Sequence, residues 1–472
     1  MWLSPQFMLT IGVLLCMCNA HISSLYTLDL NWENSHYTRT IDLAKSSIAE
    51  VDLISIKNTA HTPQSEYYYT INDGFDSVGE LSSFSVRLAD QSVDVPFEEI
   101  TANKVFKFNL PVPVAPNSDI DLKVSYVYID CLEPVPKKIR LEDVQQLLYQ
   151  TNKFPFSPYV TKDYTLIFTG MTKGQEMELH LDKAVNATNP VPYLEPRVEN
   201  RALKYGPFVE DIAPFTLKPM GLMYDHNRPL LNVISLNRSV WLPASQVNKV
   251  SIEEYYELTN SGAELSSGFS RVDWMKGRYA GTRNHWALSH LEFPLWKRKE
   301  FEDYYFTDKA GVVSTHKVVQ NHLLLSPRFP IFGGWHYNFT LGWTEDMSQI
   351  VHQSNQDTNE YLIRLPILNT LRDVTYEDVY LEFYLPENSQ YEDLASSIPY
   401  ESITVTNELS YFDVSKGHIK VTVHYRKLYD SINQVDVILK YKYSKTSLYT
   451  KVGKISAFIF TGLISYYLLN IL

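Results

Sequence analysis

The fold class is decided by two stretches near the C-terminal end, Ile419-Lys420-Val421-Thr422-Val423-His424-Tyr425 and Val435-Asp436-Val437-Ile438-Leu439-Lys440-Tyr441-Lys442-Tyr443. Apolar and polar residues alternate in both stretches, which is the period of a β-strand with one buried face. A short connection separates them, as in a hairpin. The same alternation recurs in Ile120–Tyr128, far upstream. These patterns predict an all-β protein.

Composition agrees with this prediction. The 472 residues include 33 tyrosines and only 18 glycines, and aromatic residues favour half-buried pleated surfaces. Helical spacing is scarce. It is best in Leu141–Tyr149, where acidic residues in the first turn predict a short helix that ends before Pro155 and Pro158.

An internal repeat predicts two similar domains. Arg39–Val51 aligns without gaps on Arg238–Val250 at an offset of 199, with identical residues at Arg39, Leu43, Ser46 and Val51. We therefore expect two tandem β-sandwich-like domains, residues 21–230 and 231–445, joined near 227–229. A chance match is the alternative, which a comparison of the two halves decides.

The two ends of the chain predict its relation to a membrane. Residues 1–20 carry no charge and end in Cys18-Asn19-Ala20, which is typical of a cleaved secretory signal. Residues 455–472 are also uncharged and long enough for one transmembrane helix, after a stem at 446–454. A lipid-anchor signal is the alternative for this segment. We expect a single-pass type I protein with its bulk outside the cytosol.

Glycosylation sites follow from this compartment. Sequons begin at Asn186, Asn237 and Asn338, and each is an expected glycan acceptor. The net charge of −12 argues against nucleic acid as a partner. Without the signal the chain keeps one cysteine, Cys131, for which a buried position is expected.

Motifs for catalysis are nearly absent. The sequence has no His-Glu-x-x-His, no Gly-x-Ser-x-Gly and no phosphate-binding glycine loop. Asp119 and Asp121 could hold a cation, but their place at the start of a predicted strand favours a solvated turn. We therefore expect no catalytic residue, no metal and no cofactor. A hydrolase with a carboxylate pair hidden among the 54 acidic residues is a rival.

Pro327–Tyr337 packs aromatic residues around two prolines and a glycine pair. Such a segment can form a recognition surface, or it can close the corner of a β-sandwich with Gly at the bend and Trp in the core. The sequence favours the structural interpretation.

Several ordered motifs resemble one family. The motifs are Glu253–Asn260, Gly268–Arg271, Tyr304–Thr315 and Pro327–Trp335, with weaker similarity at Ser157–Lys162 and Tyr205–Phe208. Together they resemble ribophorin I, most closely its fungal form. The resemblance covers most of the chain between the signal and the membrane helix.

The resemblance implies a role in protein N-glycosylation. Ribophorin I is an accessory subunit of the endoplasmic reticulum oligosaccharyltransferase, which transfers a preassembled oligosaccharide from dolichyl-pyrophosphate to Asn of Asn-x-Ser/Thr. Catalysis belongs to a different, multi-span subunit. The expected location is the endoplasmic reticulum membrane, and the expected partners are the catalytic and other subunits and nascent acceptor chains. A free-standing cell-surface adhesion or lipid-anchored protein is the alternative.

The membrane helix offers a candidate packing face. Ala457, Thr461 and Ser465 are spaced by four, which places small residues along one side of a helix. Small faces allow helices to approach closely in lipid. A plain anchor with incidental small residues is the alternative.

Overall fold

The computed structural model describes residues 31–71, 80–89, 93–102, 104–171, 173–177, 179, 194–243, 248–279, 286–295, 302–355, 357–409, 413 and 417–471. The chain forms two compact units. Unit 1 comprises residues up to 133 and 146–225, and unit 2 comprises 134–145 and everything from 226 onward. The predicted signal at 1–20 lies outside the described residues.

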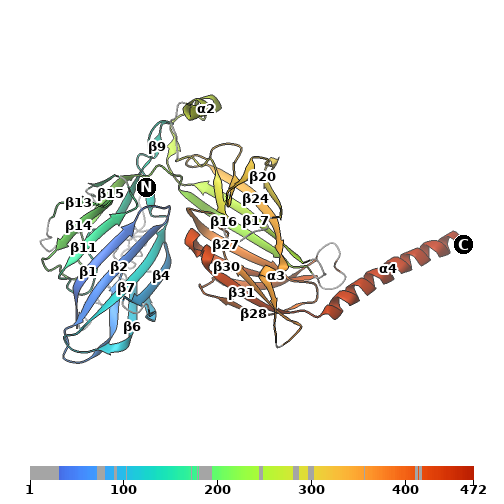
Figure 1. Ribbon diagram of the computed structural model, residues 1–472, viewed down its shortest axis with the longest axis horizontal. Helices are drawn as coiled ribbons and strands as arrows, with labels where there is room; N and C mark the ends of the chain where they lie inside the picture. Colours follow the sequence, from blue (N-terminus) through green and yellow to red (C-terminus); the bar gives the residue numbers. More distant parts are fainter. Residues whose placement is uncertain are drawn as a thin grey trace, which may run out of the picture. The chain divides into compact units, whose positions relative to one another are not determined.

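The described residues of unit 1 form three sheets (Figure 1). The seven-stranded sheet has the order β13 (Arg197–Glu199), β14 (Ala202–Phe208), β11 (Tyr164–Thr169), β1 (Trp32–Asp42), β2 (Ile48–Asn58), β7 (Asp119–Ile129) and β4 (Glu80–Leu88). A four-stranded sheet has the order β12 (Gly174–Met177), β15 (Pro219–Asp225), β10 (Gln146–Asn152) and β8 (Leu132–Pro134). A three-stranded sheet has the order β3 (Gln64–Thr70), β6 (Val105–Val114) and β5 (Phe97–Thr101).

Unit 2 repeats this plan. Its eight-stranded sheet has the order β29 (Ser402–Glu408), β30 (His418–Tyr429), β27 (Val374–Tyr384), β16 (Leu231–Trp241), β17 (Lys249–Asn260), β24 (His336–Asp346), β20 (Glu302–Asp308) and β21 (Gly311–Val312). The four-stranded sheet has the order β28 (Gln390–Ser396), β31 (Asp436–Lys442), β26 (Glu360–Pro366) and β25 (Val351–Gln353). The three-stranded sheet has the order β19 (Leu291–Pro294), β23 (His322–Leu325) and β22 (His316–Val319).

The two units share strand order and pairing sense. In the large sheets, β1 pairs parallel with β11 and antiparallel with β2, and β16 pairs parallel with β27 and antiparallel with β17. The irregularity in the first pair lies between Asn34 and His36, and in the second between Val233 and Ser235, again 199 positions apart. Fourteen strands correspond one to one in chain order, from β1 with β16 to β15 with β31.

The gapless alignment of Arg39–Val51 on Arg238–Val250 holds for the first strand and fails in the second. Arg39 faces Asp52 across the strand pair, and Arg238 faces Glu254. The arginines are 199 positions apart, whereas their partners are 202 apart. The connection in unit 2 is therefore three residues longer. An odd shift turns every side chain to the other face of the sheet, so a gapless alignment misplaces the second strand completely.

The remaining elements lie in unit 2. They are α2 (Arg271–Tyr279), α3 (Met347–Ile350), a 3₁₀ turn at Asp430–Gln434, the C-terminal α4 (Lys445–Ile471) and the two-stranded pairing of β9 (Lys138–Ile139) with β18 (Glu264–Leu265). The all-β prediction is confirmed. The hairpin expected of Ile419–Tyr425 and Val435–Tyr443 is wrong, because their strands β30 and β31 belong to different sheets. The short helix predicted at Leu141–Tyr149 is wrong, because Leu147 and Tyr149 are buried alternate residues of β10, which pairs with β15.

Candidate functional site

The membrane helix is the first candidate site. α4 is 27 residues long, which is about 40 Å of helix. Its residues Thr446–Ile471 are long enough and apolar enough to cross a bilayer, and none of them is buried against the rest of the chain. Only Tyr443 and Ser444 separate β31 from α4, so the predicted stem at 446–454 forms the first turns of the helix.

Within unit 2, an ion-pair latch joins α4 to the segments that follow β27 and β29. Lys451 Nζ lies 2.9 Å from Glu387 Oε2 and 3.0 Å from Asp413 Oδ1, and the two acidic side chains are only 1% exposed. His418 Nε2 lies 3.1 Å from the same Asp413 oxygen. A membrane-proximal lysine on this side of the span therefore has a specific partner site in the folded unit, which the sequence could not reveal.

The three residues of the predicted packing face lie on α4. Ala457, Thr461 and Ser465 are exposed on consecutive turns. Thr461 Oγ1 donates to the carbonyl of Ala457, and Ser465 Oγ donates to that of Thr461, both at 2.8 Å. Because the hydroxyls bond within their own helix, they leave a narrow face that another helix could approach.

The sequons have different surroundings. Asn186 lies outside the described residues. Asn237 is half-buried in the middle of β16, and Asn338 is half-buried on β24, where its Nδ2 donates to Tyr255 Oη at 2.9 Å. Both point away from the core, because their chain neighbours Leu236 and Phe339 are buried in it.

An arm of the first half completes unit 2. Residues 134–145 leave unit 1 and pair with unit 2 through β9 and β18. The buried side chain of Gln145 donates to the carbonyls of His226 (3.0 Å) and Arg228 (2.9 Å) and accepts from the N–H of Ala263 (2.8 Å). The arm is therefore fastened by a fully bonded amide as well as by strand pairing.

Part of the aromatic segment Pro327–Tyr337 packs into a buried cluster. The buried cluster that receives the arm consists of Ile139, Ala263, Trp286, Ala287 and Phe332, with Leu141, Leu265, Phe269, Trp274 and Trp335 packed against it. Gly333 lies close to the segment just before β18. A Cβ atom at Gly333 would sit 2.1 Å from the carbonyl oxygen of Gly262. Close backbone approach requires the glycine, and the burial of Phe332 favours the structural interpretation for this part of the segment, whereas Phe329 is exposed.

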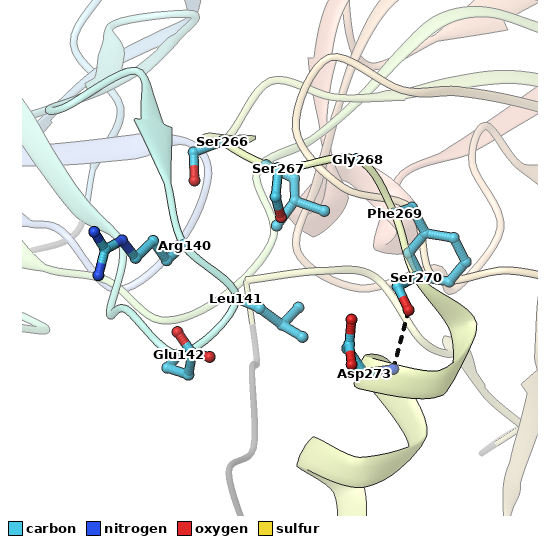
Figure 2. A pocket seen from close by; sticks show the side chains of 10 residues that line it. Arg140, Leu141, Glu142, Ser266, Ser267, Gly268, Phe269, Ser270 and Asp273 are labelled. Carbon is cyan, nitrogen blue, oxygen red and sulfur yellow. Dashed lines mark hydrogen bonds between the residues drawn. The ribbon is translucent and has the colours of Figure 1, made fainter.

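A pocket of about 300 Å³ lies beside the arm. It is lined by Arg140, Leu141, Glu142, Leu265, Ser266, Ser267, Gly268, Phe269, Ser270 and Asp273. Figure 2 shows the arm on one side and the start of α2 on the other, where Ser270 Oγ accepts from the backbone N–H of Asp273 at 3.3 Å. The lining offers carboxylates, hydroxyls and one guanidinium, but no histidine or cysteine.

Buried ion pairs lie in the interiors of the units and not in this pocket. Arg39 and Glu50 form a buried ion pair in unit 1, and Arg238 and Glu254 form one in unit 2. Burial, followed by the charge of Glu50, raises the pKa of Asp52 to about 7. Asp52 Oδ2 accepts from Tyr37 and Tyr69, both at 2.6 Å. These groups hold strands together and none lines the pocket.

Two further candidates from the sequence, Cys131 and the pair Asp119 and Asp121, lie where neither catalysis nor metal binding is favoured. Cys131 is half-buried and not fully buried as expected. Desolvation raises the pKa of its thiol well above its ordinary value, so this cysteine is a poor nucleophile. Asp119 begins β7, and Asp121 accepts a hydrogen bond from Ser55. Among the described residues, no group of three or more His, Cys, Asp or Glu side chains is arranged to hold a metal ion.

Comparison with known proteins places the chain in a family. A model of the Ribophorin I family matches residues 32–470. Dolichyl-diphosphooligosaccharide–protein glycosyltransferase subunit 1 of Caenorhabditis elegans is 27% identical over 76% of this chain, and the same subunit of Schizosaccharomyces pombe is 24% identical over 92%. Subunit 1B of Arabidopsis thaliana is 26% identical over 64% of the chain.

The relatives differ in how much of them is matched. The chain spans 58% of the worm protein and 61% of the plant protein, but 94% of the S. pombe protein. Among solved structures, native yeast LTA4 hydrolase aligns over 46% of this chain and 30% of its own chain, at 10% identity and a TM-score of 0.27. This similarity is too low to indicate a shared fold. Because the family match includes both units and the membrane helix, this chain belongs to the Ribophorin I family.

Proposed function

We propose that this chain is a non-catalytic subunit of the oligosaccharyltransferase complex, which transfers a preassembled oligosaccharide from dolichyl-pyrophosphate to Asn of Asn-x-Ser/Thr in nascent proteins. The observation that carries the proposal is the family match over residues 32–470, which spans unit 1, unit 2 and α4. A relative matched over 94% of its length has the name of subunit 1 of that glycosyltransferase.

The same proposal includes location and partners. The chain is anchored in the endoplasmic reticulum membrane by α4, as a type I protein with both units in the lumen. Its partners are the multi-span catalytic subunit and the other subunits, and its units also contact nascent acceptor chains. The latch at Lys451 supports an assembly role, because it couples the span to the rest of unit 2 without a loose linker.

Depletion in cells tests the proposal. Lowering the level of this chain should reduce sequon occupancy on several unrelated secreted glycoproteins, measured by mass spectrometry, and wild-type chain should restore it. A variant with Glu142→Gln and Asp273→Asn should restore it equally well, because the pocket acids have no catalytic part in this account. Unchanged occupancy after depletion would favour the alternative of a free-standing adhesion or lipid-anchored protein.

A further inference from the structure

The outward face of the large sheet in unit 2 carries two sequons side by side. Strand alternation places Asn237 of β16 and Asn338 of β24 on this face, with only β17 between them. Asn237 faces Tyr255 and Asn338 faces Glu257, so the two side chains are separated by two strand spacings of about 4.8 Å across the sheet and by two residues along it. The structure thus brings together two acceptors that are far apart in the sequence.

Tyrosine rings flank both acceptors. Asn237 is paired directly with Tyr255 on one side and with Tyr380 on the other. Tyr380 stacks on His424 with ring centroids 4.5 Å apart and an interplanar angle of 7°, so its ring is held in place. Tyr255 accepts the hydrogen bond from Asn338 Nδ2. A sugar attached to either asparagine would begin against an aromatic side chain.

The composition of this face suits carbohydrate better than a protein core. The outward positions on the six strands from β29 to β24 are mostly polar or aromatic, among them His418, Lys420, Glu382, Tyr384, Trp241 and Glu253. Ile234, half-buried at the irregularity of β16, is an aliphatic exception. Tyrosine and tryptophan rings can stack on the C–H faces of a pyranose, and carboxylates accept its hydroxyls.

The equivalent face of unit 1 provides an internal comparison. Its outward positions include Val51, Leu53 and Ile167, and Leu53 is 44% exposed. No sequon lies on the described strands of that sheet. Since the two units share one strand plan, the difference belongs to the surfaces and not to the fold. A subunit contact with an apolar core fits the unit 1 face and not the unit 2 face.

We propose that N-linked glycans on Asn237 and Asn338 lie on this face, with their inner sugars stacked on Tyr255 and Tyr380. The chain's own carbohydrate then covers the face and keeps it out of subunit contacts. This inference rests on the lumenal location in the proposed function. Attachment forms a bond from Asn Nδ2 to the anomeric carbon of the lipid-pyrophosphate oligosaccharide; Nδ2 loses one proton and the lipid pyrophosphate leaves.

The tether explains why a weak stacking interaction suffices. A covalently attached sugar is held at high effective concentration beside the rings, so each contact forms without the cost of bimolecular binding. The modified Asn338 keeps one N–H, which can still donate to Tyr255. The geometry therefore predicts a glycan that lies along the sheet and does not extend freely into solvent.

The test uses the full chain purified in its complex. Peptide mass spectrometry gives the occupancy of Asn237 and Asn338, and timed digestion with endoglycosidase H compares glycan release from native and denatured protein. We expect both sites to be occupied, with slower release from native protein. A Tyr255→Ala, Tyr380→Ala variant should speed native release about threefold to tenfold, the range expected for one aromatic contact. Tyr400→Ala, an exposed tyrosine outside this face, is the matched control.

The outcomes separate this inference from the function it rests on. Equal release rates from native and denatured protein, or rates unchanged by the double tyrosine variant, would overturn the stacked arrangement. Empty sites at Asn237 and Asn338 with an occupied Asn186 would overturn it while leaving the lumenal location intact. A chain without sugar at any of the three sequons would also overturn it, and would count against the lumenal location itself.

Discussion

Arg39 and Arg238 hold the same place in the two units. Arg39 Nη1 donates to the carbonyl of Asn152, the last residue of β10, and Arg238 Nη1 donates to the carbonyl of Pro366, the last residue of β26; both distances are 2.5 Å. Each guanidinium also pairs with a buried glutamate of the next strand of its large sheet. One buried arginine thus joins two sheets in each unit.

Removing either arginine should destabilise its unit strongly. Arg238→Met leaves Glu254 buried without its cation, which should lower the free energy of unfolding by about 3–5 kcal/mol. Arg39→Met should lower the free energy of unfolding further, because Glu50 and Asp52 are then both buried beside the missing guanidinium.

Denaturant unfolding of the full chain in detergent measures the loss in both variants. Arg364→Met removes an exposed pair with Asp436 and should cost less than about 1 kcal/mol; equal losses in all three variants would contradict this account.

Asp52 should make the stability of unit 1 depend on pH. Its pKa is about 7 in the folded chain and near 3.8 when unfolded, so the folded state holds the extra proton between these values. Stability should therefore be highest below about pH 4 for this group and fall as the pH rises through 7. Asp52→Asn, which mimics the protonated acid, should be nearly neutral at pH 3.5 and most stabilising at pH 8. Unfolding curves at the two pH values measure this, and a variant with the wild-type slope would rule the assignment out.

Gly333→Ala should release the arm at 134–145. The new Cβ would meet the carbonyl oxygens of Gly262 and Ala263 at 2.1 and 2.2 Å, so the backbone must move. Trypsin should then cut faster after Lys137 and Lys138. Gly268→Ala is the matched control, since nothing lies within 4 Å of its Cβ position. Equal cutting rates in the two variants would show that the close approach is unimportant.

Lys451→Met should loosen the join between the membrane helix and the rest of unit 2. The change leaves Glu387 and Asp413 without their lysine, and we expect faster proteolysis at the join and less chain in assembled complex. Lys454→Met removes an exposed lysine three residues on and should behave like wild type. If both variants assemble normally and resist protease, the latch has no part in positioning the span.

The small face of α4 should contribute to assembly. Replacing Ala457, Thr461 and Ser465 with Leu keeps the helix apolar but prevents close approach, so co-purification of partner subunits should fall. Ile459→Leu with Leu463→Ile changes exposed apolar residues on the opposite side of α4 and serves as the control. Wild-type levels of complex in the triple variant would mean that α4 is only an anchor.

Alternation predicted the β-strands well because it is a local property, as in Ile419–Tyr425, which lies within β30. The repeat was visible for the same reason around Arg39 and Arg238. The connection that follows the first strand is three residues longer in unit 2, and a gapless comparison cannot detect such an insertion.

Long-range contacts were beyond sequence reasoning. Leu141–Tyr149 contains acidic and apolar residues at helical spacing, yet it divides between the arm of unit 2 and strand β10 of unit 1. Lys451 looked like an interfacial lysine until the fold brought Glu387 and Asp413 to it. The two sequons were found as motifs, but their common face depends on strand order, which neither motif encodes.

The proposed function makes this chain a subunit of a membrane-bound glycosyltransferase complex. The most direct test is purification of the tagged full chain in mild detergent, followed by native mass measurement and identification of the co-purifying chains. The account predicts a stable assembly that contains a multi-span catalytic subunit and transfers oligosaccharide to an Asn-x-Ser/Thr peptide. A chain that purifies alone, with no transferase activity, would contradict it.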